Sequence, residues 1–530
     1  MKQYINKIFL VGLMLIAASC SEEFLETSPT NSVSPSNALS TPTNMMVALN
    51  GVHRTMYQQS DLDEYNYAGE GYILPMLEFP ASDALHTTTG NGWFRANLQW
   101  IRHTNPSSDD IAWVWYHYYH IIGSVNAIIN ASAGMTEDAL LSNVLGQAKA
   151  YRAWAHFRLV QLFAKNYMHG NPASDLGIPI MLSTDAPYEG LPRATVKEVY
   201  TQIVKDIEES IKHFEKASAS PNKSHISAKV ASGIAARVYL VTGEWAKAAA
   251  AAKTARTGFN LMNETEYKSG FNTNSGTEWM WGGRLVSDQT TYFYAWFYYI
   301  GTNFGGAQNR SNPKIINKKL YDLIPSTDYR KSMWLEKAPN EVLGQKNDPN
   351  YPVAADFTAA TKAFEAKYGM TSSYYLHPYM SVKFLNKTAG SSEPDDVLYM
   401  RVSEMYLIEA EALARAGGQD AAAAKTLFDL VSKRDAAYVQ STKTGQDLIE
   451  EIKIQRRIEL WGEGHRWFDM LRYDEALDRT GTGASESLYQ KGFSQAKPSE
   501  NVNWVFQIPQ NEIDANPQIG TANQNPSKPL

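Results

Sequence analysis

Apolar residues recur at helical spacing along most of this 530-residue chain. Steps of three and four residues predict amphipathic helices on both sides of a less regular middle. The predicted helices cover residues 45–57, 113–132, 145–166, 195–214, 227–241, 246–256, 402–416, 421–434 and 449–472. Residues 259–400 show weak helical periodicity, with a helix expected at 313–323 and strand alternation at 278–283. The aromatic run from Tyr292 to Tyr299 is expected to form a half-buried strand or a loop ledge. The pattern therefore predicts a mostly α protein with an irregular, loop-rich subdomain.

Two neighbouring pairs of these helices form short antiparallel units. Residues 227–241 and 246–256 are joined by Gly243-Glu244-Trp245, and residues 402–416 and 421–434 by Gly417-Gly418. The alanine-rich partner helices allow close approach, and the pairs resemble tetratricopeptide repeats. Long inserts separate the pairs, so we expect a tetratricopeptide-like superhelical scaffold rather than a regular tandem array.

The stretch from Ile449 to Arg472 places a cation on an apolar helix face. Arg456 shares a stripe with Ile449, Ile452 and Leu460, and a buried guanidinium must be paired. Three nearby carboxylates could pair with it, namely Glu459, Glu463 and Asp469. We interpret the stretch as a polar network that locks helix ends together. A catalytic carboxylate–histidine pair is the alternative.

The amino terminus resembles a bacterial lipoprotein signal. A short basic segment precedes an 11-residue apolar run, Ile8 to Ala18, which is too short to span a bilayer. Small residues then lead to Cys20, the only cysteine in the chain. We predict a signal peptide over residues 1–19, acylation of Cys20 and a flexible tether over residues 20–42. The alternative is an ordinary signal peptide with a chance cysteine.

Two irregular inserts contain the residue types that bind sugars. Aromatic rings stack on the flat face of a sugar ring, and Asn, Asp and Arg satisfy its hydroxyls. Residues 58–112 form the first insert, and the second candidate segment spans residues 285–312. The candidate ligand residues are Asp83, Trp93, Arg95, Asn97, Tyr292, Tyr294, Trp296 and Tyr298, with His86, Asn91, Asn309 and Arg310 beside them. Core packing is the alternative for each aromatic residue.

Other chemistries have little support in the sequence. A net charge of −6 argues against nucleic acid as a partner. No phosphate-binding loop or calcium loop is present. His117 and His120 suit a metal pair poorly, and the adjacent acids Asp109-Asp110 and Glu450-Glu451 point apart, whereas a glycosidase needs carboxyls that face each other. We therefore predict no catalytic residue, no cofactor and no metal site.

Separated motifs over nearly the whole chain resemble the SusD/RagB family of outer-membrane nutrient-binding lipoproteins. The C-terminal signature matches at Arg456, Arg457, Glu459, Leu460, Glu463, Gly464, Arg466, Trp467, Phe468, Asp469 and Arg472, and departs at Gln455 and Gly462. Further matches are Trp115, Tyr119, Ile122 and Asn126, then Arg152-Ala153-Trp154, Gly177-Ile178-Pro179, Arg401 to Ala412, and the tail from Ile508 to Pro526. Of these, Asn126 is expected to be a buried hydrogen-bonding residue.

The resemblance implies a SusD-like fold and a role. Residues 43–258 would form an N-terminal helical scaffold that contains the insert 58–112. Residues 259–400 would form a loop-rich, ligand-binding insert, and residues 401–530 a C-terminal scaffold. The protein would be a surface-exposed lipoprotein of the outer membrane that binds an oligo- or polysaccharide without catalysis. It would deliver the glycan to a SusC-like TonB-dependent transporter. A peptide-binding member of the family, or a glycoside hydrolase, are the alternatives.

Overall fold

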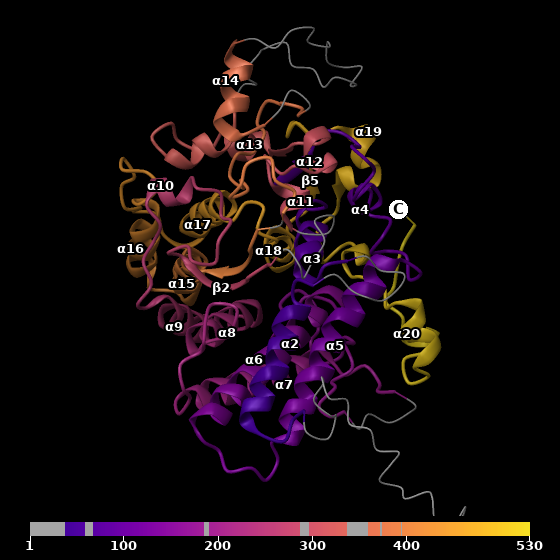
Figure 1. Ribbon diagram of the computed structural model, residues 1–530. Helices are drawn as coiled ribbons and strands as arrows, with labels where there is room; N and C mark the ends of the chain where they lie inside the picture. Colours follow the sequence, from indigo (N-terminus) through magenta and orange to yellow (C-terminus); the bar gives the residue numbers. More distant parts are fainter. Residues whose placement is uncertain are drawn as a thin grey trace, which may run out of the picture.

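The fold is mostly helical, as the sequence predicts, and Figure 1 shows helices at one end of the molecule and a loop-rich part at the other. We describe a computed structural model of the chain that covers residues 38–58, 67–184, 190–286, 296–336, 359–370, 374–393 and 395–529. Three predicted functional residues, Cys20, Tyr292 and Tyr294, lie outside the described residues. Among the described segments, no helix combines the length and apolar character needed to cross a bilayer.

Four long helices form the N-terminal scaffold. They are α2 (Pro42–Thr55), α5 (Asp109–Ala131), α6 (Ala139–Phe163) and α7 (Val196–Phe214), and α6 packs against the other three. Side-chain caps fix where they begin: Asp138 accepts a hydrogen bond from the Leu141 amide, and Thr195 forms a capping box with Glu198. The central helix α6 is buried along most of its length, and its apolar residues belong to one hydrophobic core that continues into the loop-rich part.

The two predicted helix pairs are confirmed. The first pair is α8 (Ala228–Thr242) and α9 (Trp245–Arg256), and the second is α15 (Val402–Ala416) and α16 (Asp420–Val431). Helix α15 packs against α9, which joins the pairs, and α17 (Gly445–Glu459) packs against α15. Helix α18 (Arg466–Tyr473) follows after the turn at Gly462 and Gly464. Gly233 on α8 lies so close to Met400 that a Cβ there would meet its sulfur at 2.4 Å.

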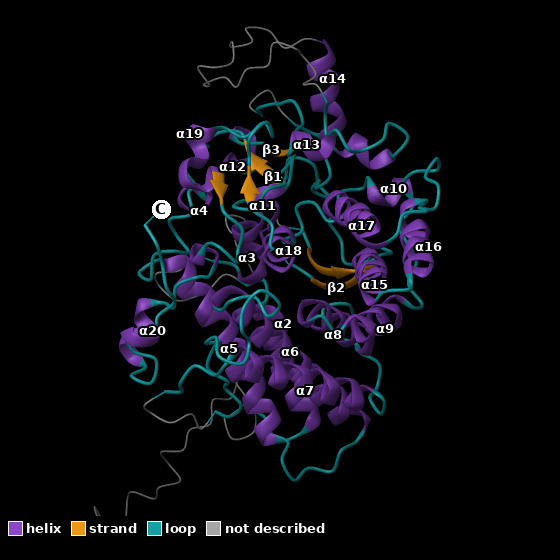
Figure 2. Cartoon of the chain, turned by 180° about the vertical axis from the view of Figure 1, so that it is seen from behind, coloured by secondary structure: helices purple, strands orange, loops and turns teal. Residues whose placement is uncertain are grey.

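Short elements make up the loop-rich part. Its described residues form three antiparallel strand pairs: β1 (Ala84–His86) with β3 (Lys314–Ile316), β2 (Trp279–Gly283) with β4 (Val397–Arg401), and β5 (Leu477–Asp478) with β6 (Ser494–Gln495). The first two pairs join segments that are far apart in the sequence. The short helices of this part are α4 (Arg95–Leu98), α10 (Glu264–Tyr267), α11 (Trp296–Ile300), α12 (Ala307–Ser311), α13 (Lys318–Tyr321), α14 (Ala359–Tyr368) and α19 (Glu486–Tyr489), whereas α20 (Gln510–Ala515) lies outside it, beside α5 (Figures 1 and 2). The pairing of β1 with β3 joins the two predicted inserts, and Figure 2 shows these strands among the loops.

Three local predictions are wrong. The segment 58–112 is not irregular throughout, because α3 (Gly69–Glu78) forms there with every residue buried. A helix buried on all sides shows no amphipathic period. The helix expected at 313–323 is strand β3 followed by one turn, α13. The aromatic run before Ile300 was expected to be a strand or a loop ledge, yet its described part, Trp296–Ile300, is helix α11.

Candidate functional site

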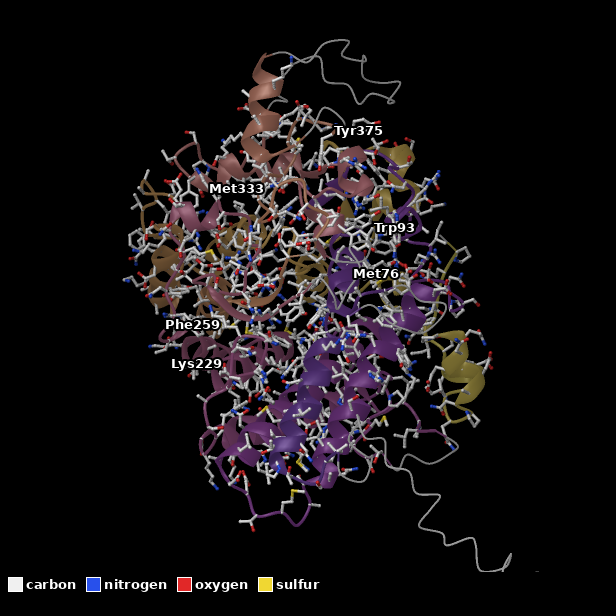
Figure 3. All side chains as sticks on the ribbon, in the orientation of Figure 1. Met76, Trp93, Lys229, Phe259, Met333 and Tyr375 are labelled. Atoms are coloured by element: carbon white, nitrogen blue, oxygen red, sulfur yellow. The ribbon has the colours of Figure 1, made fainter. Side chains whose placement is uncertain are left out.

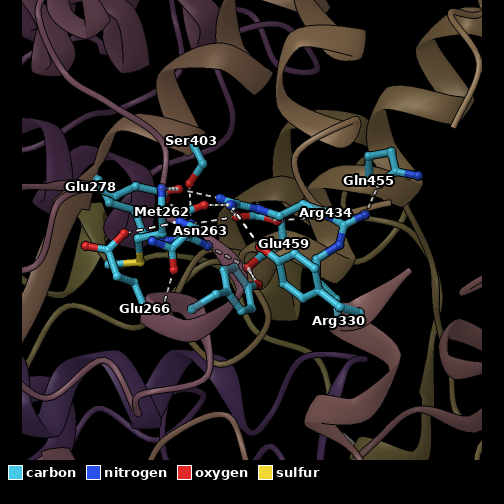
Figure 4. Close-up of polar contacts among 12 residues, drawn as sticks. Met262, Asn263, Glu266, Glu278, Arg330, Ser403, Arg434, Gln455 and Glu459 are labelled. Carbon is cyan, nitrogen blue, oxygen red and sulfur yellow. Dashed lines mark hydrogen bonds and ion pairs between the residues drawn. The ribbon is translucent and has the colours of Figure 1, made fainter. Parts of the chain in front are cut away.

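A buried network of charges connects the C-terminal signature to the rest of the fold. Glu459, near the end of α17, accepts hydrogen bonds from Arg330 (2.9 Å), Arg401 (2.7 Å) and Arg434 (3.0 Å), and no part of its side chain is exposed (Figure 4). Burial alone would raise its pKa, but the three guanidinium groups hold it well below the ordinary value. Glu278 pairs with two of these arginines as well. The network fixes α17 against β4, the turn that follows α16 and the 3-10 helix Tyr329–Met333.

The predicted pairing of Arg456 is confirmed, and its partner is Asp469. Arg456 Nε donates to Asp469 Oδ2 at 2.7 Å, while Arg472 Nε donates to the other carboxylate oxygen at 2.8 Å. Burial lowers the pKa of His465 well below its usual value. Glu463 is held ionised between Arg401 and Lys383. The hydrogen bonds of Asp469 therefore hold α18 against α17, as expected of a polar network that locks helix ends together.

Asp83 and Asn97, two of the predicted ligand residues, already have protein partners. Asp83 is 1% exposed and accepts from Arg457 at 2.9 and 2.7 Å, with Arg466 3.3 Å away. Burial acts against ionisation of Asp83, but the two arginines lower its pKa to about 2. The Asn97 amide donates to Asp110 at 2.6 Å. Both side chains therefore hold the 58–112 segment in place and are engaged by the protein, not free to bind a ligand.

A surface around Trp93 remains as the candidate binding face. Trp93 is half-buried, and its ring meets Tyr298 at 6.2 Å between centroids and Tyr299 at 5.8 Å. Asn91 and Arg95 are exposed beside it, and Arg310 is partly exposed. We call these four residues, with the partly exposed Tyr375, the Trp93 surface. Figure 3 shows Trp93 and Tyr375 on the same side of the loop-rich end.

Hydrogen bonds between the two inserts hold the Trp93 surface together. Ser311 receives a bond from Thr88 at its carbonyl (2.9 Å), and its hydroxyl lies 3.4 Å from the Asn91 side chain. Within residues 259–400, the Tyr375 amide donates to the Arg310 carbonyl at 2.7 Å. The Ser311 contacts place Asn91 of the first insert beside the second, and residue types that suit a sugar, an aromatic ring with amide and guanidinium groups, occur on both segments.

Tyr298 and Trp296, two further predicted ligand residues, are buried. Tyr298 is 2% exposed and packs against Phe304 as well as Trp93. Trp296 is 4% exposed and meets the Phe384 ring edge-on at 4.4 Å. In the described structure these two rings are packed in the core, so they do not offer a ligand the face that the sequence predicted.

Sequence reasoning passed over Gln308, which lies beneath the same surface. Its side chain is fully buried, and neither amide atom has a hydrogen-bond partner among the described residues. Its amide oxygen faces the turn at Gly90, where an added Cβ would lie 3.4 Å away. A buried amide without hydrogen bonds lowers the free energy of unfolding by about 1–3 kcal/mol, so we expect Gln308 to destabilise the fold. Nothing in the sequence around Gln308 distinguishes it from a surface glutamine.

The structure shows no metal cluster in the described part of the chain. No group of three or more His, Cys, Asp or Glu residues there could hold an ion. His117 is 1% exposed, and burial lowers its pKa to about 3. Asp110, the second of the paired acids, accepts from Tyr67, Tyr72 and Asn97. These residues are part of the packing of α5.

The motif around Asn126 has the structural role that was predicted. Asn126 is fully buried, accepts from Arg152 at 2.9 Å and donates to the Met181 carbonyl at 3.1 Å. Arg152 in turn pairs with Asp206 on α7 at 2.5 Å. One polar chain therefore connects α5, α6 and α7 with the loop after residue 176.

Comparison with known proteins gives consistent matches over the whole chain. Residues 245–527 match the SusD family, and residues 23–240 match a family described as "Starch-binding associating with outer membrane". SusD-like protein P38 of Formosa agariphila is 22% identical over 522 residues, which cover 90% of this chain and 93% of that protein. SusD-like protein P25 of the same organism is 20% identical over 515 residues, covering 89% and 90%.

Solved structures share the fold. A SusD-like carbohydrate binding protein from Bacteroides vulgatus superposes with a TM-score of 0.75 at 24% identity, covering 93% of this chain and 99% of that one. A laminarin binding SusD-like protein gives a TM-score of 0.59 at 19% identity, covering 92% and 99%. SusD family proteins bind their ligands and do not catalyse reactions. The chain therefore belongs to the SusD family of non-catalytic, carbohydrate-binding proteins that associate with the outer membrane.

Proposed function

We propose that this protein captures an oligo- or polysaccharide on the Trp93 surface and delivers it to a SusC-like TonB-dependent transporter. The observation that carries the proposal is the half-buried ring of Trp93, which packs against Tyr298 and Tyr299 and has the exposed Asn91 and Arg95 two residues away on either side in the chain. A laminarin binding relative shares the fold, which supports a glycan as the ligand class.

The chemistry of the Trp93 surface suits a sugar ring. The tryptophan offers a flat apolar face for the C–H groups, and its two tyrosine neighbours restrict its motion, which lowers the entropic cost of binding. The amide of Asn91 and the two guanidinium groups offer donors to ring hydroxyls at the edge of that face. Arg310 and Asn91 come from different inserts, and we expect a glycan on the Trp93 surface to contact both of them.

The lipid anchor and the transporter complete the proposed role. Acyl chains on Cys20 would hold the protein at the outer membrane, where its relatives are described as associating. The helical scaffold would provide the contact with the transporter, leaving the loop-rich end for the glycan. The protein would bind the glycan without making or breaking covalent bonds.

Calorimetry on the mature protein against a panel of polysaccharides and peptides tests the proposal. We expect a glycan to bind, and Trp93→Ala to weaken it by about thirty-fold, or roughly 2 kcal/mol, as for an aromatic anchor. Trp245→Ala is the matched control, because Trp245 is also a partly buried tryptophan but lies on α9 of the scaffold. Unchanged glycan affinity in Trp93→Ala, or binding of peptides alone, would contradict the proposal.

A further inference from the structure

A cavity lies between helix α5 and the C-terminal segment. Its volume is about 420 Å³, within the range of ligand pockets in proteins. Trp115, Tyr116 and Tyr119 of α5 form one wall, and Pro179, Met181 and Leu191 line it from the loop before α7. The segment around Glu512 on α20 closes the third side. Figures 1 and 2 both show α20 beside α5, away from the loop-rich end.

Most polar groups in this cavity are already engaged by the protein. Glu512 accepts from Trp115 Nε1 at 3.2 Å and from the Asn516 amide at 2.8 Å. The same Asn516 amide donates to the Leu191 carbonyl at 2.9 Å, and the Tyr119 hydroxyl donates to the Pro179 carbonyl at 2.8 Å. Few donors and acceptors remain for the hydroxyls of a sugar. The walls therefore favour an apolar group over a glycan.

The apolar lining continues onto the open surface. Tyr116 is 41% exposed at the edge of the cavity, and Leu182, which follows the lining residue Met181, is 40% exposed. Large exposed hydrophobic residues that adjoin a hollow mark places where another molecule binds. An inserted side chain would be enclosed by aromatic rings, the environment typical of the anchor residues of protein interfaces.

The charged side chain on the lining of the cavity is acidic. Among the described residues that line it, Glu512 is the one with a charge, and none is basic. Each carboxylate oxygen of Glu512 accepts one bond from the protein, so each has a further lone pair to offer. Exposed Asp109 and Asp514 lie one helical turn from the lining residues Ala112 and Asn511. A basic group beside the inserted side chain would complement this charge.

We propose that the cavity between α5 and α20 docks a polypeptide segment of a partner protein, which inserts an apolar or aromatic side chain next to a lysine or arginine. The delivery step of the proposed function requires a protein partner, and in that respect the inference rests on it. The cavity is separate from the Trp93 surface, so an experiment can disprove one proposed site without disproving the other.

Blocked tetrapeptides test the chemistry on the full mature protein without glycan. The probes are acetyl-Gly-Phe-Arg-Gly-amide and two controls, with Glu in place of Arg or Ala in place of Phe. Saturation-transfer NMR and calorimetry should show that the Phe-Arg peptide binds with a Kd of about 1 mM, and that each control binds about ten-fold more weakly or not at all. Glu512→Gln should weaken the Phe-Arg peptide by at least about five-fold while leaving the Phe-Glu peptide unchanged or improved.

Variants separate docking from folding and from glycan capture. Tyr116→Ala removes an exposed ring and should abolish Phe-Arg binding with an unchanged melting temperature, whereas Leu323→Ala, which changes a 51% exposed residue elsewhere, should have no effect. Trp93→Ala should bind the peptide normally. Failure of every peptide to bind, equal binding of the Phe-Glu and Phe-Arg peptides, or binding that survives Tyr116→Ala would overturn the inference. Displacement of the peptide by a polysaccharide would also overturn it.

Discussion

Replacing Glu459 with glutamine should destabilise the protein strongly while preserving the shape of the side chain. One carboxylate oxygen accepts from Arg401 (2.7 Å) and Arg434 (3.0 Å), and the other from Arg330 (2.9 Å) and Arg434 (3.3 Å). Whichever oxygen becomes the amide nitrogen, two hydrogen bonds are lost and an NH₂ group faces guanidinium donors.

The magnitude follows from the number of bonds and from the uncompensated charge. A hydrogen bond to a charged group contributes about 1.5–3 kcal/mol, so two lost bonds amount to about 3–6 kcal/mol. Removing one partner of a buried ion pair costs about 3–5 kcal/mol in other proteins, which agrees. None of the three arginines is more than 1% exposed at its side chain, so water cannot take the place of the carboxylate.

Urea unfolding followed by circular dichroism gives the free energy of unfolding for this comparison. Glu450→Gln is the matched control, because Glu450 lies on the same helix with its side chain 49% exposed and pairs with Lys453 at 3.1 Å. It should change stability by no more than about 0.5 kcal/mol. A loss below about 1 kcal/mol for Glu459→Gln, measured with an unchanged m-value, would refute the view that this network braces the scaffold.

Three further predictions concern other parts of the chain. Gln308→Met should raise the free energy of unfolding by about 1–3 kcal/mol, because it removes a buried amide without partners; a destabilised variant in thermal melts would show that the amide has a structural role. Asp83 has its folded pKa lowered from 3.8 to about 2, so its ionised form stabilises the fold above about pH 4 and this contribution is lost as the pH falls toward 2. The stability gap between the wild type and Asp83→Asn, followed by unfolding at each pH, should therefore be largest above pH 4 and close near pH 2, and a gap that stays constant would contradict the assignment. Cys20→Ala should move the protein from the membrane to the soluble fraction in cell fractionation, and unchanged membrane retention would argue against acylation.

The sequence predicted the helical scaffold well because its helices are amphipathic. Helix α7 has a one-sided apolar stripe and a Thr195 cap, and both are readable along the chain. Arg456 could be placed on an apolar face with three candidate partners, of which Asp469 is the one observed. Local spacing is sufficient for such contacts.

The loop-rich part was harder to predict because its contacts are long-range. Asp83 pairs with Arg457, which lies 374 positions further along the chain, so an aspartate of the kind that binds sugars turned out to have a protein partner. Helices α3 and α11 are buried on every side and show no polar face from which a period could be read. The unsatisfied amide of Gln308 depends on the packing of two inserts, which no local pattern reveals.

The most direct measurement for the central claim is a crystal structure of the mature protein with the glycan that binds most tightly in the calorimetric panel. The account predicts a sugar ring stacked on Trp93 at van der Waals distance, about 4 Å, with hydroxyls that accept from Asn91, Arg95 or Arg310. A glycan bound elsewhere on the protein, with Trp93 still uncovered, would contradict it.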